Sequence, residues 1–185
     1  EDYIKINILS IAKSVVPLRA FSNNNKELET ECLFGEKCEV LSVSEEWVFC
    51  KLIKDKYRGW IKKSSLGLEV YPTHKINVKN SIIFDKPNVK SRPYAYLSFG
   101  SELEVTSTNN NWSKIYFSKG SKLFFKYIPT NHLVDINYIK KDWVNTAEIF
   151  LHTPYKWGGK SFLGIDCSAL SQLALFSKCQ KAFRN

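Results

Sequence analysis

A single cysteine, Cys167, lies where a glycine-rich stretch gives way to a helical pattern, in the segment PYKWGGKSFLGIDCSALSQLAL (154–175). Asp166 precedes it and belongs to the residue types that cap helix N-termini, which predicts that Cys167 is the first helical residue. Unpaired backbone N–H groups and the helix dipole favour an anion at that position, so the thiolate is stabilised. A thiolate is the form of cysteine that attacks a carbonyl carbon. The spacing therefore suggests a nucleophile, although a buried structural cysteine at a helix start is the default reading.

Tyr155 is the candidate partner of this thiol. Its phenolic O–H could stabilise a developing oxyanion if the turn at Gly158-Gly159 folds it back over the thiol. Cys179 has no comparable setting, and we expect it to be inert.

The other cysteines do not suggest a metal site or a disulfide framework. The chain of 185 residues has five cysteines, an odd number without a CxxC spacing, so neither a metal nor another cofactor is expected. Cysteines of this kind are mostly small buried hydrophobes, which weakly favours a reducing, cytoplasmic compartment. No apolar run is long enough for a transmembrane helix, and the N-terminal segment does not have the pattern of a signal peptide.

The net charge of +9 is uneven along the chain. Residues 74–134 contain most of the excess, but their lysines are scattered singly and are not interleaved with a stacking platform. This pattern favours a solvated surface over a nucleic-acid site.

A repeat of about 65 residues organises the first two thirds of the chain. LFGEKCEVLSVSEEW (33–47) aligns with SFGSELEVTSTNNNW (98–112), and each segment places a Phe-Gly pair ahead of a Glu-Val pair and a tryptophan. The repeats contain short strand-like runs, such as CEVLSV and WVFCKLI, separated by turn-forming clusters. Gly35 and Gly100 mark tight bends, and Trp47 and Trp112 are expected to be packing residues. Each repeat is predicted to form a small β-barrel.

The periodicity becomes helical after residue 135. We predict a helix over 142–151, capped by Asp142, with one apolar face. That face would comprise Trp143, Ala147, Phe150 and Leu151. A second helix follows Asp166, and its apolar side chains include Leu170, Leu173, Ala174 and Phe176. Such a face must be covered by the barrels, by a partner, or by a further segment of protein.

The two repeats resemble bacterial SH3-like barrels, on the residues PLR (17–19), LFGE (33–36), Trp47 and YRGWI with the following leucine (57–66). The segment 147–175, with Pro-Tyr-x-Trp-Gly-Gly and Asp-Cys-Ser-Ala-Leu, resembles the front half of NlpC-type cysteine peptidases. These are papain-like enzymes that cleave the peptides of murein, the bacterial cell wall. The implied fold is mainly β, with two tandem SH3-like barrels at 1–73 and 74–134 and the helical front part of a papain-like α+β domain at 135–185.

The resemblance also implies an activity and roles for individual residues. It implies a γ-D-glutamyl–diamino acid endopeptidase, in which Cys167 is the nucleophile and Tyr155 aids the oxyanion. Asp166 and Ser168 would hold the free amine of the L-alanine of a murein stem peptide. Tyr57 of the first barrel would help to close that end of the site.

The chain departs from the family at the catalytic histidine, which relatives place after the nucleophile helix. His74, His132 and His152 all precede Cys167, and His152 falls where the family ends a helix. We therefore expect that this chain is a truncated version of the enzyme and is inactive by itself. A non-catalytic protein that binds wall peptide or glycan through its barrels is the alternative.

Overall fold

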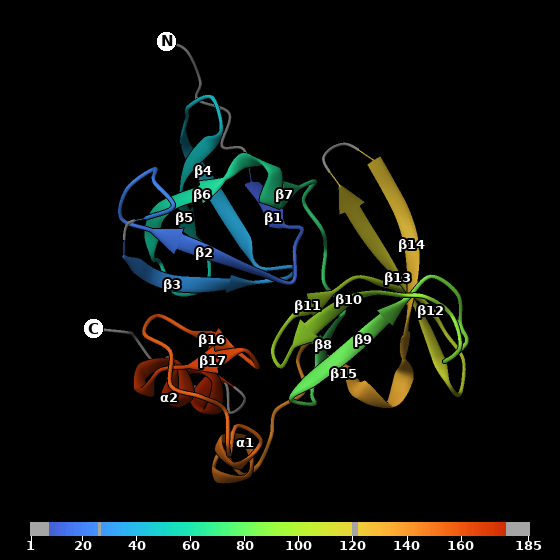
Figure 1. The fold of residues 1–185 in the computed structure, drawn as a ribbon. Coiled ribbons are helices and arrows are strands. Elements are labelled where there is room, and N and C mark those ends of the chain that lie inside the picture. The colour runs from blue at the N-terminus through green and yellow to red at the C-terminus, as the bar shows by residue number, and fades with distance from the viewer. Residues whose placement is uncertain (1–7, 26, 120–121, 177–185) are drawn as a thin grey trace.

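The computed structural model describes residues 8–25, 27–119 and 122–176. Figure 1 shows two β units side by side and a small helical part that lies beneath the first unit. The fold is mainly β with SH3-like sheets, as the sequence predicted.

The first β unit is one seven-stranded sheet that curls around its own core. Its order is β3-β2-β6-β5-β4-β1-β7, and all the strand pairs are antiparallel. The strands are β1 (Ile8–Ile11), β2 (Val15–Arg19), β3 (Leu28–Leu33), β4 (Lys37–Val43), β5 (Trp47–Leu52), β6 (Arg58–Lys62) and β7 (Leu66–Gly67). Side chains such as Leu18, Val48 and Ile61 point inward from successive strands and form the core.

The second unit consists of a five-stranded sheet, β10-β9-β14-β13-β12, and a three-stranded sheet, β11-β8-β15. Its strands are β8 (His74–Ile76), β9 (Asn80–Phe84), β10 (Pro93–Ser98), β11 (Glu102–Leu103), β12 (Val105–Thr108), β13 (Trp112–Lys119), β14 (Lys122–Pro129) and β15 (Leu133–Asp135). A short 3-10 turn follows β6 at Lys63–Ser65 and β14 at Thr130–His132, so the repeat in the sequence is a repeat in the structure.

The two units meet at the predicted tight bends. Gly35 and Gly100 both have positive φ, +84° and +81°, which glycine adopts without steric cost. Next to Gly35, the ring of Phe34 stacks on Phe117 of the second unit at 4.7 Å between centroids. A Cβ at Gly35 would lie 1.9 Å from the carbonyl oxygen of Glu102, so the second unit leaves no room for a side chain there.

The helical part comprises α1 (Val144–Glu148), a β-hairpin of β16 (Lys160–Ser161) and β17 (Gly164–Ile165), and α2 (Cys167–Phe176). The predicted helix over 142–151 is only partly correct. The Asp142 carboxylate accepts the N–H of Val144 at 2.8 Å. After Glu148, however, the chain continues in turns whose hydrogen bonds join residues three apart, and His152 lies in the last of these turns with a φ of +63°.

Part of the predicted apolar face is exposed. Phe150 is buried, but Trp143, which precedes α1, and Leu151, which lies in the turn after it, are exposed, so their assignment to the packed face was wrong. The turn bonds replace helical ones from Phe150 onward, and the side chains no longer follow a period of 3.6 residues.

Helix α2 is covered by both barrels. Ala169 and Leu173 are buried in a cluster with Leu33 of the first unit and Phe99 of the second, and Leu170 packs against the cluster. Of the three ways in which this face could be covered, the structure therefore uses the barrels. The side chain of Phe176 and residues 177–185, including Cys179, lie outside the described residues.

Replacing Leu173 by alanine is expected to destabilise the protein by about 2–4 kcal/mol, because it empties the place where α2 contacts both barrels. Leu163→Ala is the matched control, since Leu163 is largely exposed, and it should cost less than about 0.5 kcal/mol. Urea unfolding followed by tryptophan fluorescence measures both. Equal losses would mean that α2 does not dock on the barrels in solution.

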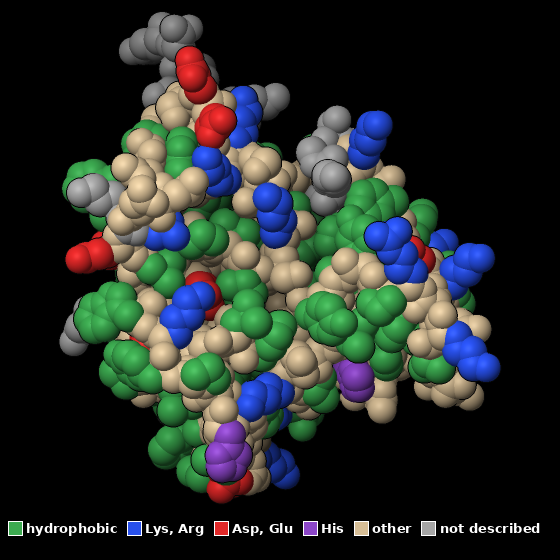
Figure 2. Space-filling view, viewed as in Figure 1, with side chains coloured by type: hydrophobic (Ala, Val, Ile, Leu, Met, Phe, Trp, Pro, Cys, Tyr) green, Lys and Arg blue, Asp and Glu red, His purple; other side chains and the backbone are tan. Residues whose placement is uncertain are grey.

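None of the described helices is long and apolar enough to cross a membrane. On the face that Figure 2 shows, the lysine and arginine side chains are spread over both barrels and the helical part rather than gathered into one patch.

Candidate active site

The start of α2 is held by the carboxylate of Asp166. Its Oδ1 accepts the N–H of Ala169 at 2.7 Å and the hydroxyl of Ser168 at 2.9 Å, and its Oδ2 accepts the N–H of Gly158 at 3.0 Å. Asp166 is therefore an N-cap, as predicted, and Cys167 is the first residue of the helix. The bond to Gly158 also ties the glycine turn to the helix end.

Cys167 is exposed, unlike the other described cysteines. Cys32, Cys38 and Cys50 are free thiols in the core of the first barrel and have no exposed surface. Burial raises the pKa of the Cys32 thiol well above its usual value, and the nearby charge of Glu36 adds to this rise. A buried protonated thiol is a poor nucleophile, so Cys167 is the reactive candidate among the described cysteines.

Cys167 opens into a cavity of about 300 Å³ between the first barrel and the helical part. The predicted site residues Tyr57, Tyr155, Asp166, Cys167 and Ser168 all line this cavity. Tyr57 follows β5, whereas the other four belong to the segment around the start of α2, so the fold brings distant parts of the chain together. The cavity shows a shared location; the individual roles stay predictions.

Four further residues, which the sequence did not predict, line the cavity. Glu27, Leu28 and Glu29 come from the start of β3, and Trp157 comes from the loop after Tyr155. The alternation of glutamates at 27, 29 and 31 was the available signal, because a strand places alternate residues on one face. With Asp166, the described lining contains three carboxylates, a set that suits a cationic group.

Tyr155 lies beside the hairpin that leads into α2. It forms an isolated parallel bridge with Ile165, and the N–H of Lys156 donates to the carbonyl oxygen of Ile165 at 3.2 Å. Tyr155 is 67% exposed and lines the cavity, so a ligand there can reach it.

The three histidines lie elsewhere, and none is among the described residues that line this cavity. The Nδ1 of His74 pairs with the Thr73 hydroxyl at 2.9 Å, and the Nδ1 of His132 pairs with Ser81 at 2.7 Å. Burial lowers the pKa of His132 below its ordinary value. His152 ends the turn after α1, the place expected from the family pattern.

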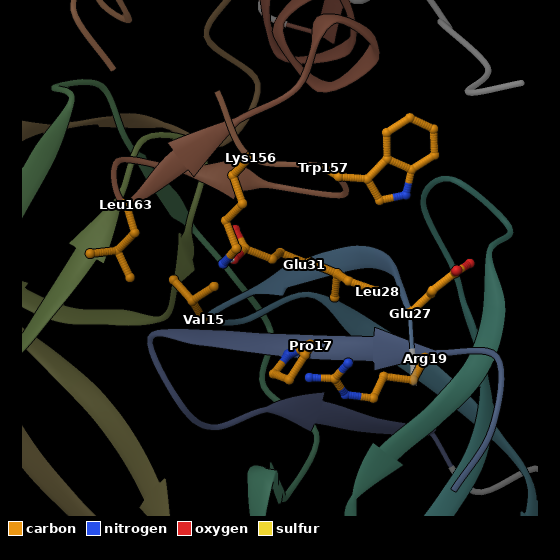
Figure 3. Close-up of a pocket in the computed structure, with 9 residues that line it drawn as sticks. All are labelled: Val15, Pro17, Arg19, Glu27, Leu28, Glu31, Lys156, Trp157 and Leu163. Atoms are coloured by element: carbon orange, nitrogen blue, oxygen red, sulfur yellow. The ribbon is translucent and has the colours of Figure 1, made fainter. Parts of the chain in front are cut away.

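A groove of about 780 Å³ adjoins the cavity and shares Glu27, Leu28 and Trp157 with it. In Figure 3, Lys156 reaches from the upper loop toward Glu31, and Val15, Pro17 and Arg19 lie along the strand below. Lys156 and Glu31 form an ion pair in this wall. The groove separates β2 from the loop that precedes α2.

Comparison with known proteins agrees with this arrangement. Residues 18–66, most of the first barrel, match the family described as the bacterial dipeptidyl-peptidase SH3 domain. An NlpC/P60 family protein from Bacillus cereus has a similar fold over 92% of this chain and 72% of its own, with a TM-score of 0.77 at 18% identity. The chain shares the fold of an NlpC/P60 family protein with SH3-like domains.

Two curated proteins resemble this chain along most of its length. Dipeptidyl-peptidase 6 from Lysinibacillus sphaericus is 26% identical over 166 residues, which is 80% of this chain and 61% of that protein. The gamma-D-glutamyl-L-lysine dipeptidyl-peptidase of Bacillus subtilis is 29% identical over 156 residues, which is 76% of this chain and 50% of that protein. The chain thus spans about half to three fifths of the length of these relatives.

Proposed function

We propose that this chain provides the nucleophile and the amine-binding side of a cysteine peptidase that cleaves γ-D-glutamyl bonds in wall-derived peptides. The observation that carries the proposal is the exposed Cys167 thiol at the start of α2, in a cavity that three carboxylates also line. The names of the curated relatives support the substrate class.

The carboxylates suit the free amino group of a peptide. A peptidase that removes dipeptides must recognise a free amine two residues before the bond that it cuts. An ammonium ion bound near Glu27, Glu29 and Asp166 would form charge-assisted hydrogen bonds there. The peptide would then extend toward Cys167, whose Sγ would meet the γ-carbonyl of the second residue.

The chemical step would follow the course of nucleophilic catalysis by cysteine. The thiolate adds to the carbonyl carbon, the new oxyanion is stabilised by the helix N-terminus and the Tyr155 hydroxyl, and the C–N bond then breaks to leave a thioester. The departing amine takes up a proton, and water later hydrolyses the thioester. That proton transfer needs an acid–base group, and the described lining of the cavity includes no imidazole.

Peptide binding can be tested without turnover. The tripeptide L-Ala-γ-D-Glu-L-Lys should slow alkylation of Cys167 by iodoacetamide, whereas its N-acetyl form should protect about tenfold less, because it has no ammonium group. The double variant Glu27→Gln/Glu29→Gln should lose most of this difference. Glu45→Gln, which removes one charge from the exposed β4–β5 turn, is the control and should behave as wild type.

Protection that is equal for the free and the acetylated peptide would contradict recognition of the amine. Absence of protection by either peptide would contradict the proposed function as a whole. The alternative, binding of wall peptide without cleavage, predicts the same protection but no thioester on Cys167 when a histidine-containing fragment of a relative is added.

Two further expectations stay predictions. The first is that these 185 residues do not turn over substrate by themselves. The second is a cytoplasmic location, which the three buried free thiols of the first barrel fit, because a reducing compartment keeps thiols free.

A further inference from the structure

The side chain of Lys160 extends from the helical part into the first barrel and places its ammonium group there. It lies in β16, its side chain is only 2% exposed, and its ammonium donates to both carboxylate oxygens of Glu36 at 2.8 and 3.1 Å. The Oδ2 of Asp55 lies 3.5 Å from the same ammonium. Glu36 belongs to the turn after β3 and Asp55 to the turn after β5. We call Lys160, Glu36 and Asp55 the clasp.

The clasp is charged and depends on docking of the barrel. Burial alone would lower the pKa of the Lys160 ammonium, but the carboxylates of Glu36 and Asp55 raise it above its ordinary value. A buried ammonium is tolerated only while it is paired, and removal of one partner leaves an uncompensated charge in the interior. If the barrel moved away, the Lys160 ammonium would lose both carboxylates, which keep only their bonds to the backbone N–H groups of Leu33 and Tyr57.

Glu31 connects the clasp to the wall of the cavity. This glutamate is 2% exposed and accepts the N–H of Lys160 at 2.9 Å and the hydroxyl of Ser161 at 2.7 Å. Its own N–H donates to the carbonyl oxygen of Gly158 at 3.0 Å. Glu31, which contacts the loop before α2, therefore lies only two to four residues from the cavity wall at 27–29.

Gly158, in the loop before α2, packs closely against Leu28 of the first barrel. Gly158 has a φ of +70°, and a Cβ there would lie 2.7 Å from Cγ of Leu28. The barrel wall and the loop before α2 thus touch at the cavity itself, and a small shift of the barrel would move Glu27 and Glu29 away from Cys167.

We propose that Lys160 is a positioning residue that sets the preference of the site for a free amine. The clasp holds the carboxylate wall, formed by Glu27 and Glu29 at the start of β3, against the loop before α2. This inference rests on the amine recognition proposed above. When the clasp is broken, Glu27 and Glu29 move away from the loop before α2 and no longer face the amine of the peptide. The site then has room for a peptide whose amine is acylated.

The docking part is measured by backbone amide exchange in the full chain. In Lys160→Met the amides of residues 31 and 160, which bond across the contact, should exchange at least about tenfold faster. Amides within the sheets, such as those of the β2–β3 pair and the β13–β14 pair, should keep their rates. Lys160→Arg should restore slow exchange, because it keeps the charge and the reach.

Two additional variants serve as a control and as a substitute in case Lys160→Met does not fold. Lys62→Met removes a lysine of the first barrel whose partner, Glu46, is largely exposed, and it should leave all of these rates unchanged. If Lys160→Met does not fold, Glu36→Gln weakens the same contact at nearly constant size and should give a smaller acceleration at the same two amides. Unchanged exchange at both amides in a folded Lys160→Met or Glu36→Gln protein would overturn the proposal.

The specificity part is measured by protection of Cys167 with the free and N-acetylated tripeptides. Lys160→Met should remove most of the roughly tenfold preference for the free amine, and Lys160→Arg should recover it. Faster exchange with an unchanged preference would overturn the assignment of specificity to the clasp. A wild-type chain that neither peptide protects would instead count against the proposed function, and the exchange rates would still decide whether Lys160 positions the wall.

Discussion

Iodoacetamide is expected to label Cys167 at least about a hundredfold faster than Cys32, Cys38 or Cys50. These three thiols have no exposed surface, so each must wait for a local opening of the barrel that costs roughly 3 kcal/mol or more. Cys167 is exposed at the first residue of α2 and needs no opening. Intact-mass spectrometry with peptide mapping gives the rate at each position.

The comparison should be made in a Cys179→Ser background, since Cys179 lies outside the described residues. In that background Cys167→Ser should leave only slow labelling. Comparable slow rates at all four thiols would show that the start of α2 is closed to reagent in solution, and the cavity would then not be a nucleophile site.

Gly35→Ala is expected to destabilise the protein by about 3–5 kcal/mol. The new Cβ would meet the carbonyl oxygen of Glu102 at 1.9 Å, and a φ of +84° adds strain for any L side chain. Neither a backbone carbonyl nor the sheet that holds it can move cheaply. The substitution also lies next to Glu36, so it should loosen the clasp.

Gly100→Ala is the matched control, because Gly100 is the equivalent glycine of the second repeat. Its φ is +81°, but a Cβ there would be 3.5 Å from Leu173, an ordinary contact. It should therefore cost only the backbone strain, about 1–2 kcal/mol. Urea unfolding measures both variants, and equal losses would mean that the two barrels do not touch at Gly35 in solution.

Local features of the sequence predicted much of the fold. The β-branched and aromatic runs at 38–43 and 47–53 became β4 and β5, and the paired glycines became bends with positive φ. Asp166 caps α2 because a carboxylate at that position satisfies N–H groups that the helix leaves free. Such features depend on residues that are neighbours in the chain, so a single sequence is enough to recognise them.

The helix at 142–151 shows where local pattern failed. Its apolar spacing fits a helix of ten residues, but the structure keeps only Val144–Glu148. Phe150 is needed in the cluster beneath Phe99, with the two rings edge to face at 5.8 Å. The early turn places Phe150 there and leaves Leu151 exposed, and periodicity along the chain does not record such a tertiary contact.

The sequence by itself determined that a thiol stands at a helix start, with a cap before it and two small barrels upstream. The tertiary structure alone decided what faces that thiol. Glu27 and Glu29 line the cavity, and Lys160 pairs with Glu36, because the surfaces of the first barrel and the helical part are complementary in shape and charge. These two parts are far apart in the sequence. Spacing along a chain specifies which residues share a strand or a helix face, whereas contacts between distant elements depend on packing that only the folded chain defines.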